Sequence, residues 1–112
     1  GLVGSEMSIR DSMISVTVTY DASIPYNAAS IDVPTNNINE ALNYAFRYTQ
    51  NTDGSWSNKI GSDANENVTV LHYLNSGNGL RSSMVGDTFT LWFNDKEFKK
   101  FKCMPIGFQE VA

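Results

Sequence analysis

The feature that most constrains the fold is a tight turn that runs directly into an alternating apolar strand. Gly86 can adopt a positive φ and Asp87 can hydrogen-bond to its own backbone, which predicts the turn. Residues 88–93 then alternate in polarity with the period of a half-buried strand. The inward positions are Phe89, Leu91 and Phe93, and the outward positions are Thr88, Thr90 and Trp92. Asn94-Asp95-Lys96 predicts a short hairpin connection into a strand at Glu97–Cys103.

Two further strands are predicted on either side of the middle of the chain. β-branched residues alternate with polar ones over Met13–Tyr20, which indicates a strand. Asp21–Thr35 contains two prolines and many small polar residues, so we expect an irregular loop with, at most, a short extended piece at Ser30–Val33. Asn67–Leu74 alternates again and is predicted to be a strand with His72 on its apolar face.

The main helix is expected to begin after Asn37. Asn37 is a suitable N-cap, and Glu40 completes a capping-box pattern in which its side chain reaches back to the N–H of the cap. Apolar residues then recur at helical spacing at Ile38, Ala41, Leu42, Ala45 and Phe46. Turn-forming residues occupy 51–55, so the helix should end near Gln50.

The remaining segments complete the predicted architecture. Trp56–Glu66 is polar and rich in Gly, Asn and Asp, and we expect a mobile loop there. Pro105 separates Glu97–Cys103 from a short terminal strand at Gly107–Val111. The sequence therefore predicts an α+β fold: a small bent antiparallel sheet or barrel of about five strands with one main helix.

Length, charge and cysteine content exclude several classes of protein. A chain of 112 residues suffices for one domain, and we expect residues 1–6 to be a tag remnant and residues 7–112 to form a single α+β domain. We expect no membrane span, because no apolar run approaches ~20 residues. We also expect no secretory signal, because the first residues are small and polar, with no apolar central region. Eight basic residues against twelve acidic ones, a formal charge of −4, argue against a general nucleic-acid coat. The single Cys103 fits a reducing cytoplasm.

No residue pattern predicts catalysis. His72 is the only histidine, and its place on an apolar strand face favours a partly buried core residue. Cys103 shares a face with Phe101, and buried free cysteines usually behave as small hydrophobic residues. The carboxylates are dispersed, and Asp53 and Asp63 in polar loops offer at most weak calcium binding. We therefore predict that the protein is not an enzyme and uses no metal or cofactor.

Four of the eight basic residues lie in one short stretch. They are Lys96, Lys99, Lys100 and Lys102, interleaved with Phe98 and Phe101. One interpretation is a basic, aromatic strip for single-stranded nucleic acid. The other, which we favour, is an edge strand whose lysines block unwanted strand pairing. Arg81, beside Ser82 and Ser83, could bind an anion, or it could hold its loop to Asp87 or to a backbone carbonyl.

Three short motifs carry a resemblance to known proteins. They are Ala45-Phe46-Arg47-Tyr48-Thr49-Gln50-Asn51, then Arg81-Ser82-Ser83-Met84-Val85-Gly86-Asp87, and finally Cys103 with Ile106-Gly107-Phe108. Across residues 37–111 this pattern resembles small phage and plasmid proteins in the neighbourhood of the YodL-like proteins. The chain departs from the pattern at Met84, where the others have Ser, and in the polar insert Trp56–Glu66. The resemblance implies a phage or mobile-element origin, a place in the host cytoplasm and no established activity.

Together these observations predict an accessory protein that acts by binding. The leading hypothesis is that it binds a host protein through the acidic, loop-rich face from Asn51 to Glu66. The first alternative is a small nucleic-acid-binding module. Its contact residues would be Arg81, Trp92, Lys99, Lys100 and Lys102. The second alternative is a structural subunit of a virion, and no pattern indicates an oligomeric state.

Overall fold

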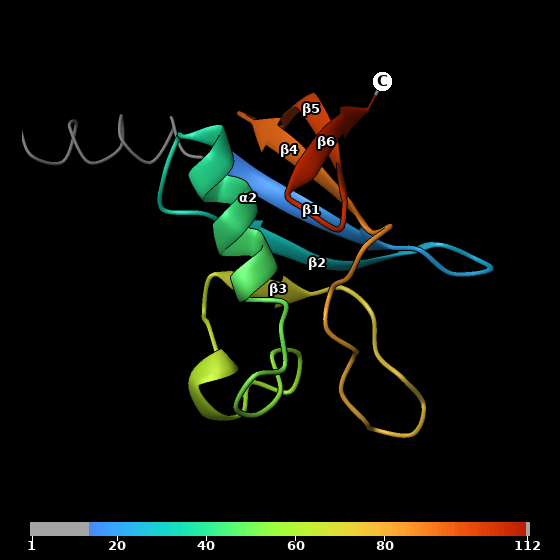
Figure 1. The fold of residues 1–112 in the computed structure, drawn as a ribbon. Helices are drawn as coiled ribbons and strands as arrows, with labels where there is room; N and C mark the ends of the chain where they lie inside the picture. The colour runs from blue at the N-terminus through green and yellow to red at the C-terminus, as the bar shows by residue number, and fades with distance from the viewer. Residues whose placement is uncertain (1–13, 112) are drawn as a thin grey trace, which may run out of the picture.

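The computed structural model describes residues 14–111, which form an open antiparallel sheet with one main helix on one face (Figure 1). The strands are β1 (Ile14–Tyr20), β2 (Tyr26–Asp32), β3 (Val68–Val70), β4 (Thr88–Phe93), β5 (Lys96–Cys103) and β6 (Phe108–Val111). The helix is α2 (Ile38–Arg47), and a turn of 3-10 helix, η1, spans Gly61–Asp63. The strand order is β3-β2-β1-β4-β5-β6, which confirms the predicted α+β fold, with six strands where about five were expected. The sheet is not closed, so the barrel alternative is wrong. The expected tag remnant at residues 1–6, and Met13, lie outside the described residues.

β1 lies inside the sheet because its alternating residues match both neighbouring strands. Val16 stands opposite Ile31 of β2 on one side and Leu91 of β4 on the other. Along β1 every second residue is buried, and the intervening serine and threonines are half-buried. The apolar residues face α2, while the serine and threonines face the opposite side of the sheet, on which no helix of the described residues lies.

Two of the strand predictions are wrong. β2 occupies seven residues of the segment that was expected to be irregular. A bulge between Val18 and Thr19 shifts its register against β1, so that Ala28 and Ala29 are both buried and the local alternation is lost. β3 is only three residues long instead of spanning Asn67–Leu74. In both cases pairing with a neighbouring strand, rather than local pattern, sets the bounds.

The start of α2 matches the prediction. The Asn37 side chain accepts a hydrogen bond from the N–H of Glu40 at 3.0 Å. The other half of the capping box is absent, because the N–H of Asn37 donates instead to Thr35 Oγ1 at 3.1 Å. The helix ends at Arg47, slightly before the expected Gln50. Within residues 14–111, α2 is the longest helix, and no helix reaches the length and hydropathy of a membrane span.

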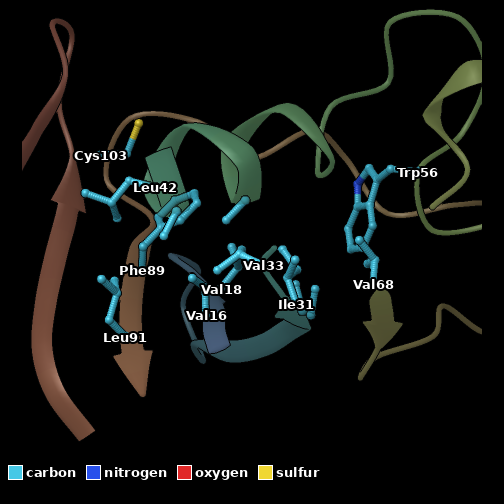
Figure 2. Close-up of a cluster of buried hydrophobic side chains, with 14 of the residues drawn as sticks. Val16, Val18, Ile31, Val33, Leu42, Trp56, Val68, Phe89, Leu91 and Cys103 are labelled. Carbon is cyan, nitrogen blue, oxygen red and sulfur yellow. The ribbon is translucent and has the colours of Figure 1, made fainter. Parts of the chain in front are cut away.

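The core between α2 and the sheet also receives a side chain from the predicted mobile loop (Figure 2). Trp56 is completely buried, and its ring lies edge-on to that of Tyr20 with a centroid distance of 6.4 Å. Ser57 and Asp63 of the same loop are buried as well. The predicted polar loop at Trp56–Glu66 is therefore attached to the domain by a large buried aromatic residue, which the sequence analysis did not foresee, while residues 58–62 are exposed.

The second half of β5 is internal to the sheet, which corrects in part our preferred interpretation of its lysines. It pairs with β4 on one side and with β6 on the other, so the edges of the sheet are β3 and β6. Lys100 and Lys102 therefore do not shield an edge, because β6 pairs with residues 100–103 of β5. Among the described residues, Lys96 and Lys99 lie in the part of β5 that pairs with β4 alone. The predicted turns around β4 are confirmed: Gly86 has φ +99°, and Asn94 and Asp95 both have positive φ in the hairpin to β5.

Candidate functional site

The five residues predicted to contact nucleic acid do not share one surface. Thr90 and Trp92 lie on the side of the sheet opposite to α2, and the register of β4 with β5 places Lys100 and Lys102 on that side too. Lys99 stands opposite Leu91 on the helix side, where its Nζ is 3.2 Å from Glu110 Oε1. Arg81 is not part of the sheet, because it lies in the segment between β3 and β4. The predicted basic strip is therefore divided among three places.

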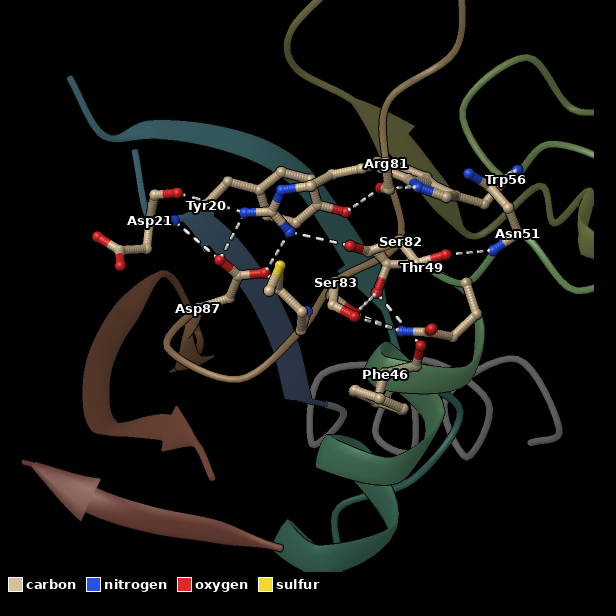
Figure 3. A network of polar contacts seen from close by, with 12 residues as sticks. Tyr20, Asp21, Phe46, Thr49, Asn51, Trp56, Arg81, Ser82, Ser83 and Asp87 are labelled. Carbon is tan, nitrogen blue, oxygen red and sulfur yellow. Dashed lines mark hydrogen bonds and ion pairs between the residues drawn. The ribbon is translucent and has the colours of Figure 1, made fainter. Parts of the chain in front are cut away.

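Arg81 forms a bidentate ion pair with the buried Asp87 (Figure 3). Its two terminal nitrogens donate to the two carboxylate oxygens at 2.8 and 2.9 Å. The guanidinium also donates to the carbonyls of Ser82 and Asp21, and its carbon lies 4.0 Å from the ring centroid of Tyr20. The hydrogen bonds from Arg81 to Asp87 raise the pKa of the guanidinium above its ordinary value. Of the two predicted roles for Arg81, the geometry matches the one in which it holds its own loop.

Asp87 connects parts of the chain that are far apart in sequence. Besides Arg81, its carboxylate accepts hydrogen bonds from the N–H of Asp21 and the N–H of Met84, both at 2.8 Å. The carbonyl of Arg81 in turn accepts the Tyr20 hydroxyl at 2.7 Å and the Trp56 indole N–H at 2.9 Å. Burial raises the pKa of the Tyr20 hydroxyl, which keeps it protonated as a donor.

The first two motifs of the phage-like pattern lie against each other. The side-chain amide of Gln50 donates to the hydroxyl and the carbonyl of Ser83, and Thr49 Oγ1 lies 2.7 Å from Ser83 Oγ. The Asn51 side chain bridges the carbonyl of Leu80 and the N–H of Trp56. These polar groups satisfy one another, so the motifs join the end of the helix to the turn before β4.

Asp63 is the centre of a second polar network. Its Oδ2 accepts the backbone N–H groups of Thr52, Asp53 and Gly54, and its Oδ1 accepts the Thr52 hydroxyl and Arg47. These bonds, led by those from the Thr52 hydroxyl and from the backbone N–H groups, hold the pKa of Asp63 well below its usual range. A carboxylate occupied by five donors offers no free oxygen to calcium, and its negative charge is buried and paired with Arg47 rather than displayed on an acidic surface. Both roles considered for Asp63 in the sequence are therefore unsupported.

His72 and Cys103 differ in how well they fit the predicted core roles. His72 lies beyond β3 and is half-buried, with its ring stacked on Tyr26 at a centroid distance of 4.1 Å, so its predicted position on a strand is wrong. Cys103 is buried as predicted, and burial raises the pKa of its thiol. Among residues 14–111 no three His, Cys, Asp or Glu side chains are grouped as a metal site would require.

An apolar groove lies between the start of α2 and the β4–β5 hairpin. It has a volume of about 550 Å³, with Ile14, Ile38, Phe93 and Phe98 as its apolar lining and Asn36, Lys96 and Glu97 as its polar lining. Phe93 and Phe98 are 38% and 41% exposed, which is high for phenylalanine. Their rings meet edge-on at 6.4 Å.

The groove depends on a bulge that sequence reasoning missed. Trp92 pairs with Glu97 and Leu91 pairs with Lys99, so Phe98 is an extra residue on β5. One signal was available in the sequence. Phe98 and Phe101 are three residues apart, and in a regular strand that spacing would place them on opposite faces.

Comparison with protein-family models, with curated proteins and with solved structures found no match to this chain. The resemblance to small phage and plasmid proteins therefore stays a prediction. The chemistry of the molecule has to be inferred from its own surfaces.

Proposed function

We propose that this protein binds another protein through the groove beside the β4–β5 hairpin, and that it serves as an accessory factor of a phage or mobile element inside the host cytoplasm. The supporting observation is the pair of exposed aromatic side chains, Phe93 and Phe98, which line the groove together with Ile14 and Ile38. Protein interfaces commonly have such a centre, in which aromatic anchors are surrounded by polar residues. The origin and location rest on the phage-like motifs.

The composition of the groove favours a polypeptide segment with an apolar anchor. Aliphatic and aromatic groups form the lining, while Lys96 and Glu97 place one charge of each sign beside it. Charges of both signs can orient a peptide without attracting polyanions in general. This surface replaces the face from Asn51 to Glu66 as the favoured site, because Asp63 there is buried and neutralised by Arg47.

A capture experiment with matched variants tests the proposal. The protein is immobilised and exposed to bacterial lysate with and without nuclease, and any captured protein is then purified and titrated against it. We expect saturable, nuclease-resistant binding that Phe98→Glu weakens by about tenfold or more, since a charge cannot enter an apolar site. Ile106→Glu is the control, because Ile106 is 94% exposed beyond the other end of β5. Equal loss in both variants, or none in Phe98→Glu, contradicts the proposal.

Nucleic-acid binding is the second candidate, and one observation favours it. Trp92, Lys100 and Lys102 share the helix-free side of the sheet with a row of threonines. Aromatic and basic groups on a sheet surface are typical of single-stranded nucleic-acid sites. Titration with oligothymidylate should then show affinity that falls steeply with added salt and that is lost in the double variant Lys100→Ala, Lys102→Ala. A virion subunit would instead form large assemblies, which light scattering would detect.

A further inference from the structure

A small polar pocket lies on the helix-free side of the sheet, across β1 from the core. It is lined by Ser15, Thr17, Ser30, Trp92 and Asp95, and its volume is about 260 Å³. This is just below the range of about 300–1,000 Å³ that suits drug-sized ligands, and it is appropriate for one sugar ring. The pocket is separate from the groove at Phe98, so a ligand bound here would not depend on the proposed protein partner.

The Trp92 side chain is held in place at this pocket. Its indole N–H donates to Thr17 Oγ1 at 2.9 Å, although Thr17 is paired with Thr90 rather than with Trp92. This diagonal bond aligns the indole with the sheet surface and makes the ring a fixed, half-buried wall. A wall that is ordered before binding loses little conformational entropy when a ligand packs on it.

The remaining lining groups are suited to recognising hydroxyl groups. Ser15, Thr17 and Ser30 present hydroxyls, each able to donate one hydrogen bond and accept others, and the Asp95 carboxylate can accept two. The side chains come from three neighbouring strands and one tight hairpin turn, so they converge from rigid elements. An aromatic wall with hydroxyls and a carboxylate matches a pyranose ring, which has apolar C–H faces and a rim of hydroxyl groups.

The charge around the pocket distinguishes a neutral ligand from a phosphate. Ser15 and Trp92 are flanked in the sheet by Asp32 on one side and Glu97 on the other, and Asp95 lines the pocket itself. Three carboxylates near one small pocket repel a phosphate group. On this side of β5, Lys100 stands opposite Thr90, so Thr90 of β4 lies between it and Thr17 of the pocket.

We propose that the pocket of Ser15, Thr17, Ser30, Trp92 and Asp95 binds a neutral saccharide, with the indole packed on the ring and Asp95 accepting hydrogen bonds from its hydroxyls. The recognition is of one or two sugar units, because the pocket is small. Single sugars bound in this way by proteins have weak affinity, so the expected dissociation constant is on the order of 1 mM.

NMR titration of the isotopically labelled 112-residue chain tests this directly. The probes are glucose, galactose, mannose and N-acetylglucosamine, with oligothymidylate in a separate arm. We expect at least one sugar to shift the Trp92 indole signal and the amides of Thr17 and Asp95 in a saturable manner, while the indole of the buried Trp56 stays unchanged. No saturable shift with any of the four sugars, or oligothymidylate moving these same signals in place of sugar, overturns the proposal.

Two variants separate binding from folding. Asp95 has φ +63° in the turn after Asn94, a conformation that glycine adopts freely, so Asp95→Gly removes the carboxylate without straining the hairpin. We expect it to weaken sugar binding by about tenfold or more. The control, Lys100→Ala with Lys102→Ala, should leave sugar binding unchanged. Sugar affinity that survives Asp95→Gly, or that falls with the lysine pair instead, contradicts the assignment.

Discussion

The two aspartates that are buried among residues 14–111 look alike in isolation but have different roles. Asp63 and Asp87 are both fully buried, and each pairs with an arginine whose side chain is about two-fifths exposed, at 39% for Arg47 and 36% for Arg81. Asp63 collects the backbone N–H groups of one short loop, from Thr52 to Gly54. Asp87 joins the end of β1, the segment before β4 and the start of β4 itself.

The comparison shows that the number of hydrogen bonds does not measure what a buried carboxylate holds together. Asp63 has more donors, but most lie within 11 residues of it in sequence, so its network can open with its own loop. Asp87 connects segments up to 66 residues apart, and these can separate only if the sheet itself opens. The two sites should therefore respond differently to the same chemical change.

Asp87→Asn should give the largest loss of stability. Each oxygen of Asp87 accepts two N–H donors, so the new amide group must point its own N–H at a donor wherever it is placed. It also leaves the Arg81 charge without its partner. We expect the free energy of unfolding to fall by about 3 kcal/mol or more, measured by urea denaturation. A loss no larger than that in Asp63→Asn would remove the distinction between the two sites.

Arg81→Lys should be the next largest change. Lysine cannot reproduce the two parallel bonds to Asp87 or the stacking on Tyr20, and we expect a loss of about 1.5–3 kcal/mol in urea denaturation. Arg47→Lys is the matched control, because Arg47 is about as exposed as Arg81 but makes only one bond, of 3.1 Å, to Asp63. It should change stability by less than about 1 kcal/mol. Equal effects would mean that bidentate geometry is unimportant here.

Asp63→Asn should be milder than Asp87→Asn. The Asn oxygen can keep the three backbone N–H groups, and its amide can donate to the Thr52 hydroxyl, which is able to act as acceptor. Of the five donors only Arg47, which makes a single bond, loses its acceptor. We expect a smaller decrease in global stability and faster hydrogen exchange confined to the amides of residues 52–54. Faster exchange throughout the sheet would show that this loop is not an independent unit.

The pH dependence of stability should come in part from Asp63. Its folded pKa is depressed, so its contribution is fully present above the unfolded value of about 3.9 and is lost as the pH falls through the folded value. Urea denaturation of the native chain should therefore show stability falling below about pH 4. The fall should be shallower in Asp63→Asn, and an unchanged slope in that variant would contradict the role of Asp63.

Tyr20→Phe should give the smallest measurable loss around Asp87. It removes the hydroxyl donor to the Arg81 carbonyl but keeps the ring beneath the guanidinium, and that carbonyl still accepts the Trp56 indole N–H. We expect a decrease of about 1 kcal/mol in urea denaturation. A decrease as large as that in Asp87→Asn would mean that the hydroxyl, not the carboxylate, holds this region together.

Several parts of the fold could be predicted because their signals are local. The cap at Asn37, the positive φ of Gly86, the hairpin after Phe93 and the alternation of β1 each depend on residues within one turn or one strand. β2 and the burial of Trp56 could not be predicted in this way. β2 depends on pairing with β1 across a bulge, and Trp56 is held by contact with Tyr20 and by a bond to Arg81.

The candidate sites divide in the same manner. Sequence reasoning selected Trp92, Lys99, Lys100, Lys102 and Arg81 from their residue types alone. Alternation along a strand already places Lys99 and Lys100 on opposite faces, but only the register of β4 with β5 decides which of them shares a face with Trp92. The pairing of β4 with β1 places Trp92 beside Thr17. The groove at Phe98 likewise arises from one extra residue in β5, which shifts every later side chain to the other face.

By itself, the sequence determined the α+β class, the start of the helix and the inward face of the central strands, because those features follow from short-range periodicity and capping. The tertiary structure decided which polar residues are buried and which surfaces are formed. Asp63 and Asp87 are indistinguishable from surface aspartates until donors from elsewhere in the chain surround them. Long-range pairing supplies those donors, and no local pattern encodes it.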